Sequence, residues 1–167
     1  VVAGKKTRLQ PDGMLLVRQE GKGMMCHFLE IDLDSMSAAQ MVAKFRRYQV
    51  WAESAVAKTY LKNLYQRHGA TAPSANFRIL IVVGSRNVPA EERRLAQLVK
   101  LAAGFPAALR DRIWFSTVNQ MQGPDERGGV LTESLWLRMR DLPAMAGAEG
   151  LNFLTNGLRH ALFGDFQ

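Results

Sequence analysis

The chain has 167 residues, and its 22 lysines and arginines outnumber its 15 acidic residues, which gives a formal net charge of +7. A single cysteine, Cys26, excludes an internal disulfide and a cysteine-rich zinc site, and no apolar run approaches the roughly 18 residues that span a membrane. The length suits one domain with a full core, and the pI near 10.0 favours a polyanionic partner such as DNA.

The ends of the chain and its cysteine content suggest where the protein resides. No signal peptide of the usual form opens the sequence, and a lone cysteine fits a reducing compartment, so we expect a cytoplasmic protein without contact to a membrane. The first residue is Val1 rather than methionine, so we also expect the chain to be part of a longer protein. No internal repeat or low-complexity tract divides it, and residues 1–167 are therefore taken as one domain.

Five segments have the composition of β-strands. Short apolar runs bounded by glycine, proline or polar residues are typical of strands. The expected strands are "MLLVRQ" (14–19), "MMCHFLEIDL" (24–33), "FRILIVVG" (77–84), "RIWFSTV" (112–118) and, with an ambiguous pattern, "VLTESLWLRM" (130–139). The glycine-rich link "EGKG" predicts that the first two strands form an antiparallel hairpin.

Three helices are expected between and after these strands. The first runs from a cap at Ser35 or Ser37 to a stop at Gly69. The second covers residues 89–104, and the third lies in the tail at residues 150–163. The core order β-β-α-β-α-β predicts an α/β fold with a mixed central sheet flanked by helices.

Three acidic side chains fall together in the expected hairpin. Because side chains alternate along a strand, Glu30 and Asp32 share one face of the second strand. A three-residue loop "GKG" places Asp12 opposite Asp32, which is the register we prefer, whereas a two-residue loop places Asp12 opposite Ile31. Carboxylates this close repel each other unless a cation lies among them, so Asp12, Glu30 and Asp32 predict a Mg²⁺ or Mn²⁺ site. The alternative is that Glu30 and Asp32 face solvent and that Asp12 is only a turn residue.

A lysine on the following helix belongs to the same candidate site. Lys44 lies at the flank of the apolar face that Met41 and Phe45 define, and Tyr48 follows one turn later. From that flank the ammonium of Lys44 can reach the end of the strand and stabilise charge that develops on a phosphate. The alternative is that Lys44 is an ordinary solvated lysine.

The motifs "PDG", "FLEID" and "KFRRY", in this order, resemble those of the replication-relaxation family of bacterial plasmid and mobile-element proteins. That family is similar to a branch of the PD-(D/E)XK nuclease superfamily, so the resemblance implies a restriction-endonuclease-like sheet. It implies a core in residues 9–118 and a C-terminal extension in residues 119–167. The superfamily core also opens with a helix and a strand, for which residues 1–10 are too short.

The resemblance also implies roles for single residues. Asp12 matches the first acid of the superfamily and Glu30 matches the second. Asp32 stands where the superfamily usually has its lysine, and Lys44 matches a lysine that has migrated to the following helix. Tyr48 matches a tyrosine that is common after that lysine.

The function implied is metal-dependent hydrolysis of DNA phosphodiester bonds, as in a nuclease or nickase, with Mg²⁺ or Mn²⁺ as cofactor. The residues expected to contact DNA are Arg18, Lys22, Arg46, Arg47, Tyr48 and Arg86, although Arg46 and Arg47 also fit an ordinary solvated helix face. Further expected partners are a second copy of the chain or other replication and mobilisation proteins.

Two alternatives remain open from the sequence. The first is a catalytically inactive nuclease-fold module that binds DNA or protein, which the acid at the usual lysine position favours. The second, weaker alternative is a nucleotide-binding domain that uses Gly84 and Ser85 at a strand–helix turn.

Overall fold

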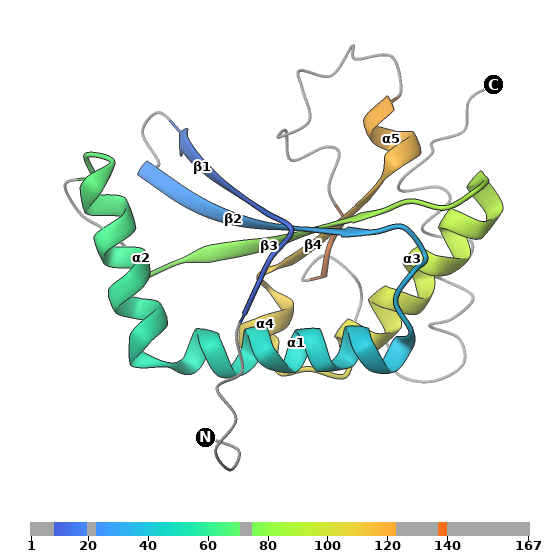
Figure 1. The fold of residues 1–167 in the computed structure, drawn as a ribbon, viewed down its shortest axis with the longest axis horizontal. Helices are drawn as coiled ribbons and strands as arrows, with labels where there is room; N and C mark the ends of the chain where they lie inside the picture. Colours follow the sequence, from blue (N-terminus) through green and yellow to red (C-terminus); the bar gives the residue numbers. More distant parts are fainter. Residues whose placement is uncertain (1–8, 20–22, 71–74, 123–136, 140–167) are drawn as a thin grey trace.

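The computed structural model describes residues 9–19, 23–70, 75–122 and 137–139 (Figure 1). Within them the strands are β1 (Gly13–Gln19), β2 (Gly23–Asp32), β3 (Phe77–Val83), β4 (Ile113–Thr117) and β5 (Leu137–Arg138). The helices are α1 (Ala38–Glu53), α2 (Ala55–Arg67), α3 (Val88–Ala103), α4 (Ala107–Arg110) and α5 (Val118–Gln122). The expected α/β class, with a mixed sheet flanked by helices, is confirmed.

The strands form one sheet in the order β1-β2-β3-β4-β5. The central strands β2, β3 and β4 are parallel, and the outer strands β1 and β5 run antiparallel to their neighbours. The chain passes from β2 to β3 through α1 and α2, and from β3 to β4 through α3 and α4. Two such crossovers of the same hand, which proceed in the same direction along the sheet, place their helices on one face of it. Figure 1 shows this arrangement, with α1 to α4 on one side of the sheet and α5 on the other. The sheet face toward α1 therefore carries the core and the candidate site.

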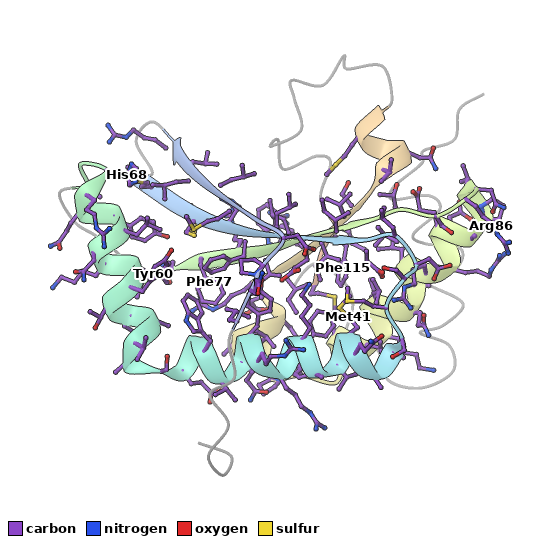
Figure 2. The ribbon with its side chains drawn as sticks, in the orientation of Figure 1. Met41, Tyr60, His68, Phe77, Arg86 and Phe115 are labelled. Atoms are coloured by element: carbon purple, nitrogen blue, oxygen red, sulfur yellow. The ribbon has the colours of Figure 1, made fainter. Side chains whose placement is uncertain are left out.

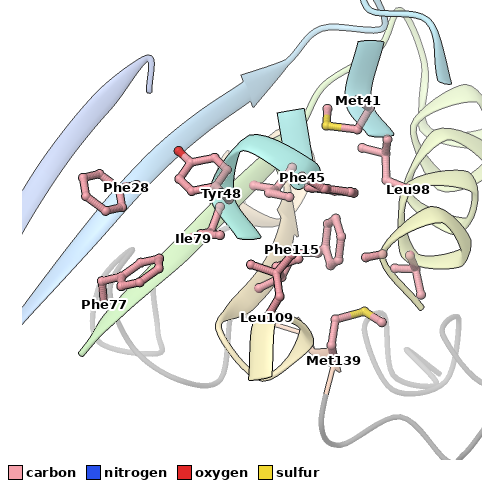
Figure 3. Packing of buried hydrophobic residues seen from close by; sticks show 14 of the residues in the cluster. Phe28, Met41, Phe45, Tyr48, Phe77, Ile79, Leu98, Leu109, Phe115 and Met139 are labelled. Atoms are coloured by element: carbon pink, nitrogen blue, oxygen red, sulfur yellow. The ribbon is translucent and has the colours of Figure 1, made fainter. Parts of the chain in front are cut away.

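The main core lies between this sheet face and the helices (Figure 3). Phe45 and Tyr48 of α1, Tyr65 of α2 and Phe115 of β4 are among its largest fully buried side chains. Strand β3 is apolar along nearly its whole length because both of its faces are covered. Its odd-numbered residues join the main core, and Leu80 and Val82 form a smaller cluster with Trp114 on the opposite face.

The expected single helix from Ser35 or Ser37 to Gly69 is wrong, because the chain breaks at Ser54. The backbone of Ser54 is extended, with φ −78° and ψ 147°, and its N–H donates to the carbonyl of Trp51 at 3.0 Å. Its Oγ accepts a hydrogen bond from the N–H of Ala57 at 3.1 Å. One serine therefore ends α1 and starts α2. The break lets α2 turn away from α1 toward the β1–β2 hairpin (Figure 1).

The hairpin register differs from both expected registers. Gly13 pairs with Leu29 and Gln19 pairs with Gly23, so one further step places Asp12 across from Glu30 rather than from Asp32 or Ile31. The backbone of Gly23 has φ 88°, in the left-handed region that favours glycine. Strand β2 therefore begins at Gly23, one residue earlier than the "GKG" loop predicts.

The remaining expected elements either agree with the structure or lie outside the described residues. Strands β3 and β4 and helix α3 lie within one or two residues of the expected ranges. Strand β5 is a short part of the expected segment 130–139, whereas the expected helix at 150–163 lies outside the described residues. Among the helices described, none has the length and apolar character needed to cross a membrane.

Candidate active site

Asp12 is hydrogen-bonded to β2 through both its backbone and its side chain. Its N–H donates to the carbonyl of Leu29 at 3.0 Å, and its Oδ2 accepts a hydrogen bond from the N–H of Ile31 at 2.8 Å. Asp12 follows Pro11 and directly precedes Gly13, the first residue of β1, so the acid lies where β1 starts. The two hydrogen bonds hold Asp12 beside Glu30, the residue between Leu29 and Ile31.

Glu30 is the buried centre of the site, with 1% of its surface exposed. Tyr48 donates its hydroxyl hydrogen to Glu30 Oε1 at 2.5 Å, and Lys44 Nζ contacts Glu30 Oε2. The same ammonium lies 3.7 Å from Asp12 Oδ2. Lys44 therefore bridges the two carboxylates that the hairpin brings together.

Helix α1 places both partners of Glu30. Ser37 caps its start through a capping box, in which Ser37 Oγ accepts from the N–H of Gln40 and the Gln40 side chain accepts from the N–H of Ser37. Met41 and Phe45 bury the apolar face. Lys44 and Tyr48 are four residues apart and therefore lie one above the other on the flank beside β2.

The environment changes the proton affinity of the buried groups. Burial raises the pKa of Glu30 above its ordinary value, and the interactions with Lys44 and Tyr48 offset that rise only in part. Burial together with the nearby Glu30 carboxylate raises the pKa of the Tyr48 hydroxyl, which therefore remains a donor. Glu30 depends on nearby positive charge to stay ionised.

The donor set of this site fits a hard divalent cation. Among the described residues, the ammonium of Lys44 is the only polar partner of Glu30 Oε2. The side chain of Asp12 is 43% exposed, that of Lys44 13% and that of Glu30 2%, so the site is accessible from the Asp12 side. Mg²⁺ commonly takes one or two carboxylates and completes its shell with water and phosphate oxygens. Asp12 and Glu30 supply such a pair.

The structure does not bring Asp32 into this site. Asp32 is fully buried, and its Oδ2 accepts a hydrogen bond from Arg94 Nε of α3 at 2.7 Å. Arg94 also donates to the carbonyl of Met36 and to Gln97, and its Nε lies 3.7 Å from Asp34 Oδ1. Across the described ranges, no group of three or more histidine, cysteine or acidic side chains is gathered as a metal site. The expected three-carboxylate cluster is therefore wrong, because the charge of Asp32 is matched by a guanidinium.

Tyr48 is also placed differently from expectation. Its side chain is fully buried, so its hydroxyl cannot lie against a DNA backbone as expected. Its role is to hold Glu30 through the hydrogen bond to Oε1. Tyr48 is therefore a positioning residue of the site.

The other residues expected to contact DNA are spread over the molecule. Arg46 and Arg47 are exposed on α1, and Arg18 donates to the carbonyl of His68 at 2.7 Å. Arg86 is exposed before α3, and Figure 2 shows it at the end of the molecule opposite His68. Lys22 lies outside the described residues. Because Arg18 contacts His68, it lies toward the end of the molecule opposite Arg86.

Gly84 has a packing role that weakens the nucleotide-binding alternative. A Cβ built on Gly84 would lie 2.9 Å from Leu33 Cδ2 and 2.9 Å from Val118 Cγ2. The space above this turn is filled by side chains, so the glycine is explained without a phosphate.

Sequence reasoning missed two buried charged residues of α3, Glu91 and Arg94. They are 1% and 6% exposed, and Glu91 Oε2 accepts a hydrogen bond from Asn119 Nδ2 at 2.8 Å. The signal lay in helix spacing, because both residues share the buried face of α3 with Leu95 and Leu98. Charged residues on such a face require partners inside the protein, so the pattern itself points to a buried polar network.

Comparison of the chain with protein-family models, with curated proteins and with solved structures gave no match. The function is therefore inferred from the geometry of the site and from the motif resemblance.

Proposed function

We propose that the chain is a DNA-associated domain of a plasmid replication or relaxation protein that hydrolyses phosphodiester bonds with Mg²⁺ or Mn²⁺. The observation that carries the proposal is the position of Lys44, whose ammonium bridges Asp12 and Glu30. A purely structural role needs no exposed acid, buried acid and lysine at one point on the molecule. Such a trio is common where a phosphate meets a metal ion.

The arrangement of the fold supports the same proposal. The two acids lie on paired strands of one hairpin, and the lysine lies on the helix that directly follows it. This is the order that the resemblance to the PD-(D/E)XK superfamily implies, with the lysine migrated from strand to helix. A restriction-endonuclease-like sheet is accordingly part of the proposal.

Each residue has a distinct part in the proposed reaction. Asp12 and Glu30 would hold the divalent ion, which when bound supplies Lewis-acid polarisation of the scissile phosphate. Lys44 would donate hydrogen bonds to a phosphoryl oxygen and neutralise its growing charge. The oxygen of a water molecule forms the new bond to phosphorus, the bond to the leaving sugar oxygen breaks, and a proton passes to that oxygen. Tyr48 would keep Glu30 in place.

A second function is favoured by one specific observation. Asp32 stands where the superfamily usually has its lysine, and here Arg94 neutralises it inside the protein. This pairing supports an inactive module that retains the nuclease fold and binds DNA or protein. Metal binding at Asp12 and Glu30 distinguishes the two functions.

The test is a calorimetric titration with Mn²⁺, followed by a plasmid-nicking assay on the same samples. For the hydrolytic function we expect Asp12→Asn and Glu30→Gln to abolish both metal binding and nicking. Lys44→Ala should retain metal binding and lose nicking, because the ammonium acts on the phosphate rather than as a ligand.

Asp34→Asn is the matched control, since it removes one acid just beyond the end of β2, outside the Asp12–Glu30 pair. Asparagine also tolerates the φ of 60° that Asp34 adopts. Metal binding that persists in Asp12→Asn and Glu30→Gln would refute the assigned site. No binding at millimolar metal would favour the inactive module.

A further inference from the structure

An exposed aromatic side chain and several cations lie along the flank that leads away from the candidate site. We define the basic–aromatic strip as Arg18 of β1, Arg47 and Trp51 of α1, and Tyr60 and Arg67 of α2. Trp51 is half-buried, whereas Tyr60 keeps 41% of its surface exposed. The rings of Trp51 and Tyr60 have centroids 6.2 Å apart in an edge-on contact.

Direct contacts fix the side of α2 that belongs to the strip. Tyr60 Oη donates to Met14 Sδ of β1 at 3.6 Å, and Figure 2 shows Tyr60 projecting from α2 toward the sheet. Seven residues make about two helical turns, so Arg67 lies on the same flank as Tyr60. Lys58 and Lys62 are two residues from Tyr60 on either side and therefore lie on the opposite flank.

The strip continues to the carboxylates without an intervening acid on either helix. Arg47 and Trp51 follow Lys44 by three and seven residues, so all three share one flank of α1. Glu53 is the only acid in the sequences of α1 and α2, and it pairs with Gln49 at 3.3 Å on another side of α1. At the far end, Arg18 is held beside the end of α2 by its bond to the carbonyl of His68.

We propose that the basic–aromatic strip binds an unpaired segment of nucleic acid, with a base stacked on Tyr60 and phosphates at Arg47 and Arg67. Cations that follow the backbone, together with an exposed ring that stacks a base, are the two features by which proteins hold single strands. A paired base does not present its face to such a ring, so Tyr60 favours an unpaired strand over a duplex. The inference deepens the proposed function, since the strip leads to Asp12 and Glu30, but strand binding itself requires no metal.

The experiment measures the binding of a short fluorescent oligothymidylate to the whole chain by anisotropy, in EDTA and at several salt concentrations. We expect Tyr60→Leu to weaken binding by about 10-fold or more and Tyr60→Phe to preserve it, because phenylalanine retains the stacking face. Arg47→Gln/Arg67→Gln should reduce the slope of log affinity against log salt by about 1.4, since each phosphate that the protein neutralises contributes about 0.7 to that slope.

The matched control is Lys58→Gln/Lys62→Gln, which removes the same charge from the opposite flank of α2. We expect this variant to retain nearly the full salt slope. An equal loss in both double variants would overturn the proposal, because binding would then follow net charge alone. Tighter binding of a duplex of the same sequence, or equal binding of polyglutamate, would overturn it as well.

Because the assay excludes metal, its outcome is independent of hydrolysis. Strand binding without metal-dependent nicking would support the strip and refute the hydrolytic function. Nicking without oligothymidylate binding would support the hydrolytic function and refute the strip.

Discussion

Tyr48 and Tyr60 stand on consecutive helices, but only the hydroxyl of Tyr48 is buried against a carboxylate. Tyr48→Phe removes the hydroxyl that donates to Glu30 Oε1, so this buried carboxylate oxygen loses that hydrogen bond. We expect this change to lower the free energy of unfolding by about 1–3 kcal/mol, measured by urea denaturation at neutral pH. It should also raise the pKa of Glu30 further, because the hydrogen bond from Tyr48 lowers that pKa.

Tyr60→Phe is the control for this change. The Tyr60 hydroxyl is on an exposed side chain and donates to a sulfur acceptor, so its removal should cost less than about 0.5 kcal/mol. Equal losses in the two variants would contradict the role assigned to Tyr48.

His27 on the opposite face of β2 is expected to make stability depend on pH. Burial, with a contribution from the charge of Arg78, lowers the pKa of His27 from 6.5 to about 4. Between these values the unfolded chain binds more protons than the folded chain, so stability is lost as the pH falls from 6.5 toward 4. The full effect is about 3 kcal/mol, at about 1.4 kcal/mol for each unit of pKa.

The measurement is urea denaturation at several pH values for the wild type and for His27→Asn. Asparagine retains a donor near the place of Nδ1, which lies 3.2 Å from the carbonyl of Met25. We expect the pH dependence between 6.5 and 4 to be smaller in the variant. An unchanged dependence would show that another group is responsible.

Three residues of the candidate site could be predicted because spacing along one element determines their position. Lys44 and Tyr48 share a helix flank, and alternation places Glu30 toward that helix, so these three follow from the sequence. The partner of Asp32 could not be found in this way. Arg94 is 62 residues away, and only the packing of α3 against the end of β2 brings the two together.

At the scale of elements, Ser54 determines the direction of α2. Ser54→Ala removes the oxygen that accepts from the N–H of Ala57, and we expect a loss of about 1 kcal/mol in the free energy of unfolding. Thermal or urea denaturation would measure it. Thr59→Ala, at an exposed position inside α2, should instead be neutral or slightly stabilising, because alanine favours helices. A similar loss in both variants would contradict the capping role.

Element types followed from the sequence more readily than element junctions. The apolar run of β3 and the pattern of residues 89–104, with Pro89 near the first turn, each predict one structure, and the structure agrees. The break at Ser54 was missed because a serine is also tolerated inside a helix. The hairpin register was missed because "EGKG" offers two glycines, and only the backbone shows that Gly23 takes the left-handed conformation.

Across the whole molecule, Arg94 connects the end of β2, the turn that follows it and α3. Arg94→Leu would leave the fully buried carboxylate of Asp32 without its cation, so we expect a loss of about 3–5 kcal/mol in the free energy of unfolding. The double variant Asp32→Asn/Arg94→Leu should recover part of this loss, because the uncompensated charge is then removed.

Urea denaturation of both single variants and the double variant forms a complete cycle. Purely additive losses would show that Asp32 and Arg94 do not stabilise the fold as a pair. Arg93→Leu is the control, because this neighbouring arginine is exposed and does not belong to the buried face of α3.

Strand β1 lies at the edge of the described sheet, hydrogen-bonded to β2 alone, and Asp12 immediately precedes its first residue. Edge strands open locally far more often than a core strand such as β3. Each such opening would carry Asp12 away from Glu30 and Lys44 while the core stays folded. The N–H of Ile31 donates a hydrogen bond to Asp12 Oδ2, and each opening breaks this bond. The hydrogen-exchange rate of the Ile31 amide therefore reports how often Asp12 leaves the site.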